Sequence, residues 1–179
     1  MEFKKICVLG AGLMGSGIAQ VAAEAGYEVS MRDIEDRFVQ GGLNTIKKNY
    51  ERAISKGKMT KEQSDAVLSR IKGFVDLPAA VKSADIIIEA VVENMDLKKQ
   101  VYKELDQLCA KEMIFASNTS GLSITEIASV TKRPEKVIGM HFFNPVPVMK
   151  LVEIIKGQAT SEDTFRIIKG LAEKLGKTP

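Results

Sequence analysis

Tryptophan is absent from the sequence, histidine occurs once, and there are only two cysteines. Cys7 and Cys109 are far apart and belong to no C-x-x-C pair or Cys/His cluster, which removes the usual ligand sets of structural zinc and any disulfide framework. Both thiols are expected to be reduced, as in a cytoplasmic protein. We therefore predict a cytoplasmic chain without a bound metal.

Long hydrophobic runs and a large charge excess are missing as well. No apolar stretch approaches the roughly 18 residues of a transmembrane helix, and 26 basic against 23 acidic residues provide no broad positive surface for nucleic acid. The P-loop pattern G-x-x-x-x-G-K-S/T does not occur. The sequence thus predicts neither a membrane nor a nucleic-acid partner, and its 179 residues suffice for one domain with a hydrophobic core.

Strand and helix patterns alternate along the chain. Apolar, β-branched runs predict strands at 3–9, 27–33, 74–75, 85–92, 113–116, 137–142 and 151–155. Capping boxes predict helices that begin at Thr60 and at Ser123, and we place Ile71 on the apolar face of the first of them. The alternation predicts an α/β fold with a doubly wound, mostly parallel sheet of the Rossmann type, into which a helical hairpin at about 34–72 is inserted.

A glycine-rich loop follows the first predicted strand and fits G-x-G-x-x-G. Asp33 ends the second strand 18 residues after the last of these glycines, where a carboxylate can bind the adenosine ribose of NAD and repel the 2′-phosphate of NADP. The adjacent Arg32 weakens that preference, and a purely structural glycine turn is the alternative. The predicted cofactor contacts are Gly10, Gly12, Leu13, Met14, Gly15 and Asp33.

Polar residues follow the later strands, at the sheet edge where such folds bind ligands. His141 is the one histidine, and an imidazole with a reference pKa near ~6.5 suits a base that removes a hydroxyl proton during hydride transfer. The turn at 144–147 lets a returning strand place Glu153 beside it, where a carboxylate would orient the ring. The alternatives are a core histidine, a solvent-facing edge carboxylate and, for Ser120, a turn residue.

Three stretches resemble the 3-hydroxyacyl-CoA dehydrogenase family, in particular the bacterial 3-hydroxybutyryl-CoA dehydrogenases. They are VLGAGLMGSGIAQ at 8–20, SNTS at 117–120 and HFFNPVPVMKLVE at 141–153. The resemblance implies reversible oxidation of (S)-3-hydroxybutyryl-CoA by NAD⁺ to acetoacetyl-CoA. It implies that His141 is the general acid and base, that Glu153 orients it, and that Ser120 binds the 3-oxygen. The matching positions for cofactor contacts are Glu93, Lys98, Ser120 and Asn144, of which Ser120 and Asn144 also border the substrate.

A basic stripe lies within the predicted hairpin, where Lys48, Arg52 and Lys56 recur at every fourth position. Spacing by itself favours a solvated charged face. The resemblance implies instead that these cations meet the phosphates of an acyl-CoA substrate.

The family continues into a C-terminal, mostly helical domain with dimer contacts, whereas this sequence ends at Pro179. The resemblance therefore implies one NAD-binding domain over 1–179, a homo-oligomer through the absent domain in the full-length form, and weak or no turnover by the chain alone. A non-catalytic NAD-binding module and a dehydrogenase of a small hydroxy acid are the alternatives.

Overall fold

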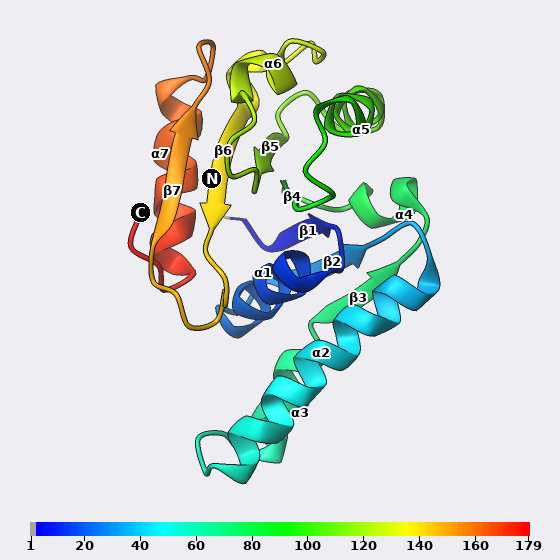
Figure 1. The fold of residues 1–179 in the computed structure, drawn as a ribbon, viewed down its shortest axis with the longest axis vertical. Helices are drawn as coiled ribbons and strands as arrows, with labels where there is room; N and C mark the ends of the chain where they lie inside the picture. Colours follow the sequence, from blue (N-terminus) through cyan, green and yellow to red (C-terminus); the bar gives the residue numbers. More distant parts are fainter. Residues whose placement is uncertain (1–2) are drawn as a thin grey trace.

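A computed structural model describes residues 3–179, whose centre is a seven-stranded sheet of order β3-β2-β1-β4-β5-β6-β7 (Figure 1). The strands are β1 Lys5–Leu9, β2 Glu28–Arg32, β3 Ile71–Phe74, β4 Ile86–Glu89, β5 Ile114–Ser117, β6 Val137–Phe142 and β7 Val152–Lys156. Neighbouring strands are parallel except β7, which runs antiparallel to β6. The doubly wound, mostly parallel sheet predicted from the sequence is confirmed.

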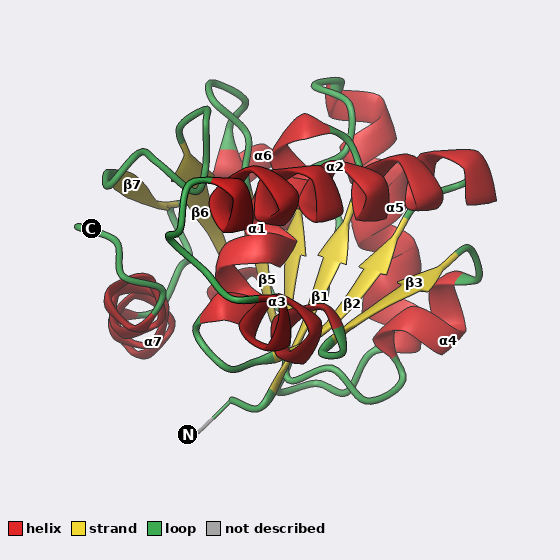
Figure 2. Cartoon of the chain, turned by 90° about the horizontal axis from the view of Figure 1, so that it is seen from below, coloured by secondary structure: helices red, strands yellow, loops and turns green. Residues whose placement is uncertain are grey.

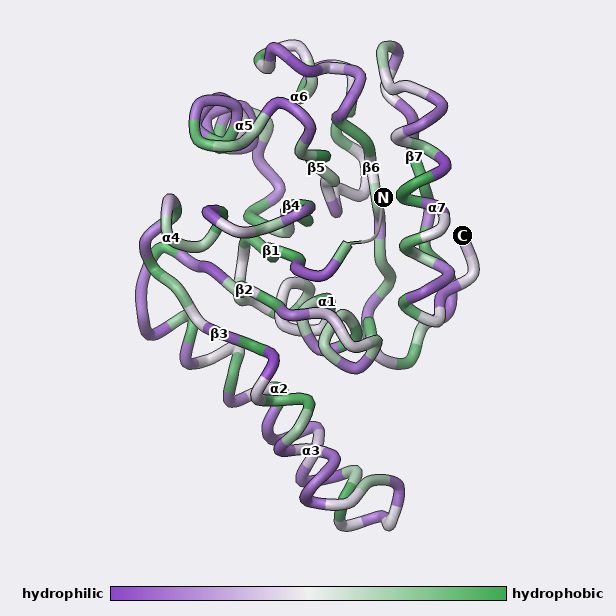
Figure 3. Tube along the Cα trace, turned by 180° about the vertical axis from the view of Figure 1, so that it is seen from behind, coloured by the Kyte–Doolittle hydropathy of each residue, from purple (hydrophilic) through white to green (hydrophobic). Residues whose placement is uncertain are grey.

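Helices flank the sheet on both sides (Figure 2). They are α1 Leu13–Glu24, α2 Asp36–Ser55, α3 Lys61–Leu68, α4 Leu77–Val81, α5 Met95–Leu108, α6 Ile124–Ala128 and α7 Glu162–Lys174, with a 3₁₀ turn η1 at Pro134–Lys136. Alternation along β1 divides the core in two, because Ile6 and Val8 join the cluster under α1, α2 and α7, while Cys7 and Leu9 join the cluster under α4, α5 and α6. Figure 3 accordingly shows hydrophobic colour along much of the central strands.

Tertiary pairing moved several of the predicted boundaries, and the strand predicted at 74–75 is β3 at 71–74. Ile71 is the first residue of β3 and pairs with Val29, so its placement on the preceding helix was wrong. The predicted strand 85–92 is shorter, since β4 ends at Glu89 and the side chain of that residue accepts the N–H of Val91 at 2.8 Å. The short helix α4 was not predicted; Asp76 caps its start through the N–H of Ala79.

The two predicted capping boxes differ in how complete they are. Thr60 and Gln63 exchange both hydrogen bonds at the start of α3. Ser123 caps α6 through the N–H of Glu126, but the carboxylate of Glu126 pairs with Lys99 of α5. The second capping box therefore keeps its serine hydrogen bond, while an ion pair between α5 and α6 takes the place of the glutamate hydrogen bond.

Helices α2 and α3 extend away from the sheet as a hairpin (Figure 1). The buried residues of α2 are Val39, Gly42, Ile46 and Tyr50, so its last turn contributes nothing to the core. Among the helices of residues 3–179, none has both the length and the apolar character needed to cross a membrane.

Candidate active site

The glycine loop between β1 and α1 leaves room for a ligand. Gly10 has φ +98°, a conformation that side chains rarely adopt, and a Cβ on Gly15 would lie 1.8 Å from the carbonyl oxygen of Gly10. At Gly12, by contrast, nothing lies within 4 Å of an added Cβ. The N-terminus of α1 has no side-chain cap and no acidic residue in its first turn. Free N–H groups and the helix dipole therefore face this space, which suits the pyrophosphate of a dinucleotide.

Asp33 connects the glycine loop to the end of β2. Its Oδ2 accepts the N–H of Ala11 at 2.7 Å, and its Oδ1 accepts the N–H of Ile34 at 2.7 Å. Asp33 also lines a cavity together with Gly12 and the first turns of α2, so its remaining lone pairs can meet a ribose. The neighbouring Arg32 donates from Nε to the carbonyl oxygen of Val75 at 2.8 Å, which ties it to the loop after β3.

A second cavity, of about 320 Å³, lies at the carboxyl ends of β4, β5 and β6. Six sequence-predicted residues line it: Met14, Glu93, Lys98, Ser120, His141 and Asn144. The structure thus brings together side chains from helices α1 and α5, from strand β6 and from the loops that follow β4, β5 and β6. Glu153 lies behind His141, and the basic stripe of the hairpin borders neither this cavity nor the one at Asp33.

His141 and Glu153 are directly paired across β6 and β7, so their predicted juxtaposition is confirmed. His141 Nδ1 and Glu153 Oε2 are 2.7 Å apart, and the ring of Phe143 packs against the imidazole with centroids 4.6 Å apart. When Nδ1–H donates its hydrogen bond to this carboxylate, Nε2 remains as the basic nitrogen. The histidine side chain is 15% exposed, which allows a substrate to reach it.

Glu93 holds the loop that carries Ser120. Its Oε1 accepts the hydroxyl of Thr119 at 2.5 Å and the N–H of Ser120 at 3.0 Å, while its Oε2 is 3.4 Å from the ammonium of Lys98. Burial alone would raise the pKa of Glu93, but the Thr119 hydroxyl, Lys98 and the Ser120 N–H outweigh it and lower that pKa. Glu93 is therefore a carboxylate at neutral pH, and it fixes Ser120 at the cavity wall.

Two residues near the site were missed in the sequence. Glu89 is fully buried below the cavity and pairs with Lys98 at 2.6 Å; the one signal for it was an acidic residue that closes the apolar run of β4. Lys177 donates to the carbonyl oxygens of Val146 and Met149 and so anchors the loop that begins at Asn144. No sequence pattern pointed to that contact.

Within residues 3–179 no cluster of three His, Cys, Asp or Glu side chains could hold a metal ion.

Comparison with known proteins gives consistent matches over nearly the whole chain. Residues 5–179 match the family model described as 3-hydroxyacyl-CoA dehydrogenase, NAD binding domain. A probable 3-hydroxybutyryl-CoA dehydrogenase of Bacillus subtilis is 54% identical over 99% of this chain and 62% of that protein. The 3-hydroxybutyryl-CoA dehydrogenase of Clostridioides difficile is 47% identical over 98% of this chain and 62% of that protein.

Solved structures agree with these matches. The crystal structure of an (S)-3-hydroxybutyryl-CoA dehydrogenase from Ralstonia eutropha superposes with a TM-score of 0.97 at 46% identity, over 99% of this chain and 62% of that one. The chain therefore spans about 62% of the length of these relatives.

Proposed function

The chain belongs to the 3-hydroxyacyl-CoA dehydrogenase family as its NAD-binding domain, and from that membership we propose that it serves the NAD-dependent interconversion of (S)-3-hydroxybutyryl-CoA and acetoacetyl-CoA. Residues 1–179 form one such domain in this proposal, with the hairpin at about 34–72 inserted. The observation that carries the proposal is the His141–Glu153 pair beside Ser120 and Asn144 in a single cavity.

The cofactor fits along the carboxyl edge of the sheet, where the strand order reverses between β1 and β4. The N–H groups at the start of α1 would hold the pyrophosphate, and Asp33 would hold the adenosine ribose. The nicotinamide would then enter the cavity of His141, since hydride transfer requires it to lie next to the carbon that carries the substrate hydroxyl. Bound NAD⁺ supplies the acceptor for that hydride.

The side chains of this chain move the proton. His141 Nε2 removes the hydroxyl proton during oxidation and returns it during reduction. Glu153 accepts the Nδ1 hydrogen bond and stabilises the imidazolium that forms, because a negative charge at 2.7 Å favours the charged ring. The hydroxyl of Ser120 donates to the substrate oxygen, and Asn144 lies at the cavity rim.

The first test is NADH oxidation by the 179-residue chain with acetoacetyl-CoA, with NADH binding measured separately by fluorescence. We expect saturable NADH binding and turnover below that of a full-length relative, because the cavity is open to water. We expect faster turnover when the chain is joined to the unmatched segment of the Bacillus subtilis relative. NADH binding without turnover in both forms would favour a non-catalytic NAD-binding module, and a lack of NADH binding would refute the proposal.

The hairpin is proposed to bind the coenzyme A moiety. Lys48 and Arg52 are exposed on α2, Lys56 caps its C-terminal end, and none of the three has an ion-pair partner among residues 3–179. A stripe of unneutralised cations suits phosphate groups.

Charge reversal at the stripe should affect the acyl-CoA and spare the cofactor. We expect Lys48→Glu to raise KM for acetoacetyl-CoA about tenfold, since a charge-assisted hydrogen bond contributes ~1.5–3 kcal/mol, with NADH affinity unchanged. Lys47→Glu is the matched control, because Lys47 is also exposed on α2 but points about 100° away around the helix. Equal rises in KM in both variants would contradict the proposal, and no rise in either would favour a small hydroxy acid as substrate.

A further inference from the structure

A buried carboxylate lies beneath the cavity of His141. Glu89 ends β4 and has no exposed side-chain surface. Its Oε1 accepts the N–H of Val91 at 2.8 Å and the ammonium of Lys98 at 2.6 Å, while its Oε2 accepts the hydroxyl of Ser117 at 2.7 Å. All three partners donate, which is the environment of an ionised carboxylate.

The ammonium of Lys98 forms one charged cluster with the carboxylates of Glu89 and Glu93, and all of its donors have partners. It is 1% exposed, and its three N–H groups can be assigned to Glu89 at 2.6 Å, to Glu93 at 3.4 Å and to the carbonyl oxygen of Val91 at 3.4 Å. Glu89 therefore holds the ammonium of Lys98 at the wall of the cavity, with its charge already paired. Two carboxylates and one ammonium leave the cluster with a formal charge of −1.

The negative end of the cluster faces the cavity. Glu93 lines it with a side chain that is 44% exposed, whereas Glu89 lies underneath. Among the cavity-lining residues that the structure describes, Lys98 is the one permanently cationic side chain, and it is already paired. His141 shares this cavity and itself faces the carboxylate of Glu153. A cation that enters the cavity meets net negative charge.

We infer that Glu89 is a positioning residue that acts through Lys98 and Glu93 and shifts the cofactor preference of this cavity toward the oxidised form. The inference rests on the proposed function, which puts the nicotinamide next to His141 and therefore over Glu93. The nicotinamide ring is positively charged in NAD⁺ and neutral in NADH, so only the oxidised ring gains from a net negative charge. Such a charge acts more strongly in a partly desolvated cavity than in bulk water.

The test is the ratio of two dissociation constants for Glu89→Gln, which keeps the shape of the side chain and removes one negative charge. NADH binding is measured by its fluorescence and NAD⁺ binding by competition with NADH. We expect the ratio Kd(NAD⁺)/Kd(NADH) to rise about tenfold, as for one charge removed at short range in an environment of intermediate dielectric. The ratio needs no catalytic turnover and can be measured on the 179-residue chain.

Two further variants separate charge from structure. Ser117→Ala removes a hydrogen bond to the same carboxylate without changing the charge, so any loss of affinity should be equal for NAD⁺ and NADH. Glu93→Gln removes the half-exposed carboxylate and should raise the ratio as Glu89→Gln does, which keeps the test valid if the buried variant does not fold. An unchanged ratio in Glu93→Gln, or in folded Glu89→Gln, overturns the inference. Failure of the wild-type chain to bind NADH would instead refute the proposed function.

Discussion

Replacing His141 by glutamine should lower the rate of NADH oxidation with acetoacetyl-CoA by about 10²–10⁴-fold, the usual contribution of a positioned general acid. NADH affinity should remain unchanged. In the wild-type chain the imidazole lies 2.7 Å from Glu153. Glutamine keeps a polar side chain opposite this carboxylate, but an amide cannot donate a proton to the substrate at neutral pH. The measurement is kcat and NADH affinity for the wild-type and variant chains, each joined to the unmatched segment of the Bacillus subtilis relative.

Phe143→Leu provides the control for this loss. The ring of Phe143 packs on the imidazole at a centroid distance of 4.6 Å but has no proton to transfer. We expect it to change kcat far less than His141→Gln does. Similar losses in both variants, or a His141→Gln chain that retains most of its turnover, would show that the histidine serves packing. A parallel loss of NADH affinity would point to a structural histidine as well.

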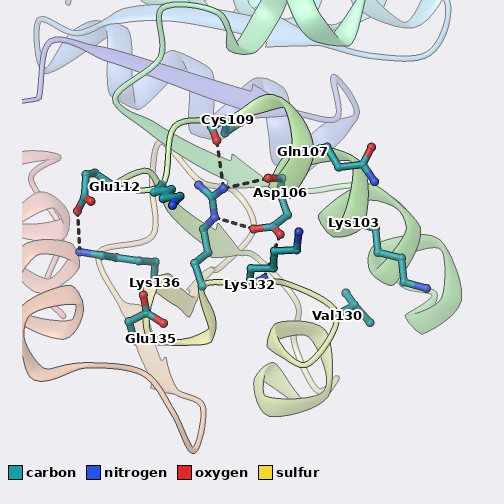
Figure 4. Close-up of a pocket in the computed structure, with 11 residues that line it drawn as sticks. Lys103, Asp106, Gln107, Cys109, Glu112, Val130, Lys132, Glu135 and Lys136 are labelled. Atoms are coloured by element: carbon teal, nitrogen blue, oxygen red, sulfur yellow. Dashed lines mark hydrogen bonds and ion pairs between the residues drawn. The ribbon is translucent and has the colours of Figure 1, made fainter.

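Removal of the Arg133 side chain should cause the largest loss of stability among the changes considered. Its Nε is 2.7 Å from Asp106 Oδ1, and further bonds go to the backbone carbonyls of Asp106 and Cys109 at the C-terminal end of α5 (Figure 4). The guanidinium also donates to the backbone carbonyl of Ala110. The guanidinium also lies over the ring of Phe115. Arg133→Met leaves the buried Asp106 carboxylate without its countercharge, with only the N–H of Lys132 still bonded to it at 3.0 Å, and removes the side-chain donor from several carbonyl oxygens. We therefore expect the free energy of unfolding to fall by about 3–5 kcal/mol.

Lys136→Met is the matched control, because Lys136 and Arg133 line the same surface cavity. Lys136 pairs with Glu112 at 3.9 Å, and Glu112 is 77% exposed, so its loss should cost about 0–1 kcal/mol. Urea unfolding of both variants measures the difference. Equal changes would contradict a structural role for the Arg133–Asp106 pair.

The cavity around Arg133 measures about 850 Å³ and is larger than the one at His141. It lies at the amino ends of β5 and β6, opposite the candidate active site, and its one buried cation is bonded to the protein itself. Size alone therefore does not identify a ligand site here, and the smaller cavity is the candidate because His141, Ser120 and Asn144 converge in it.

Local patterns were enough to predict much of this protein. The strand, glycine loop and helix of residues 5–24 follow from neighbouring residues. Glycine permits the positive φ that the turn requires, and apolar periodicity sets the buried face of each element. The placement of Glu153 beside His141 was also predictable, since the proline-containing turn at 144–147 lets the chain return alongside β6, and the antiparallel pairing of β6 with β7 puts the two residues opposite each other. The family resemblance then supplied the expected reaction and the roles of individual residues.

The remaining features depend on contacts between distant residues. Glu89 and Ser117 are 28 residues apart, and Arg133 and Asp106 are 27 apart, so neither pair leaves a local pattern in the sequence. Ile71 belongs to β3 because Val29 of β2 pairs with it. The sequence by itself determined the fold class, the glycine loop and the pairing of His141 with Glu153. Only the tertiary structure decided which buried charges lie beneath them, because burial and ion pairing are set by the packing of separate strands and helices.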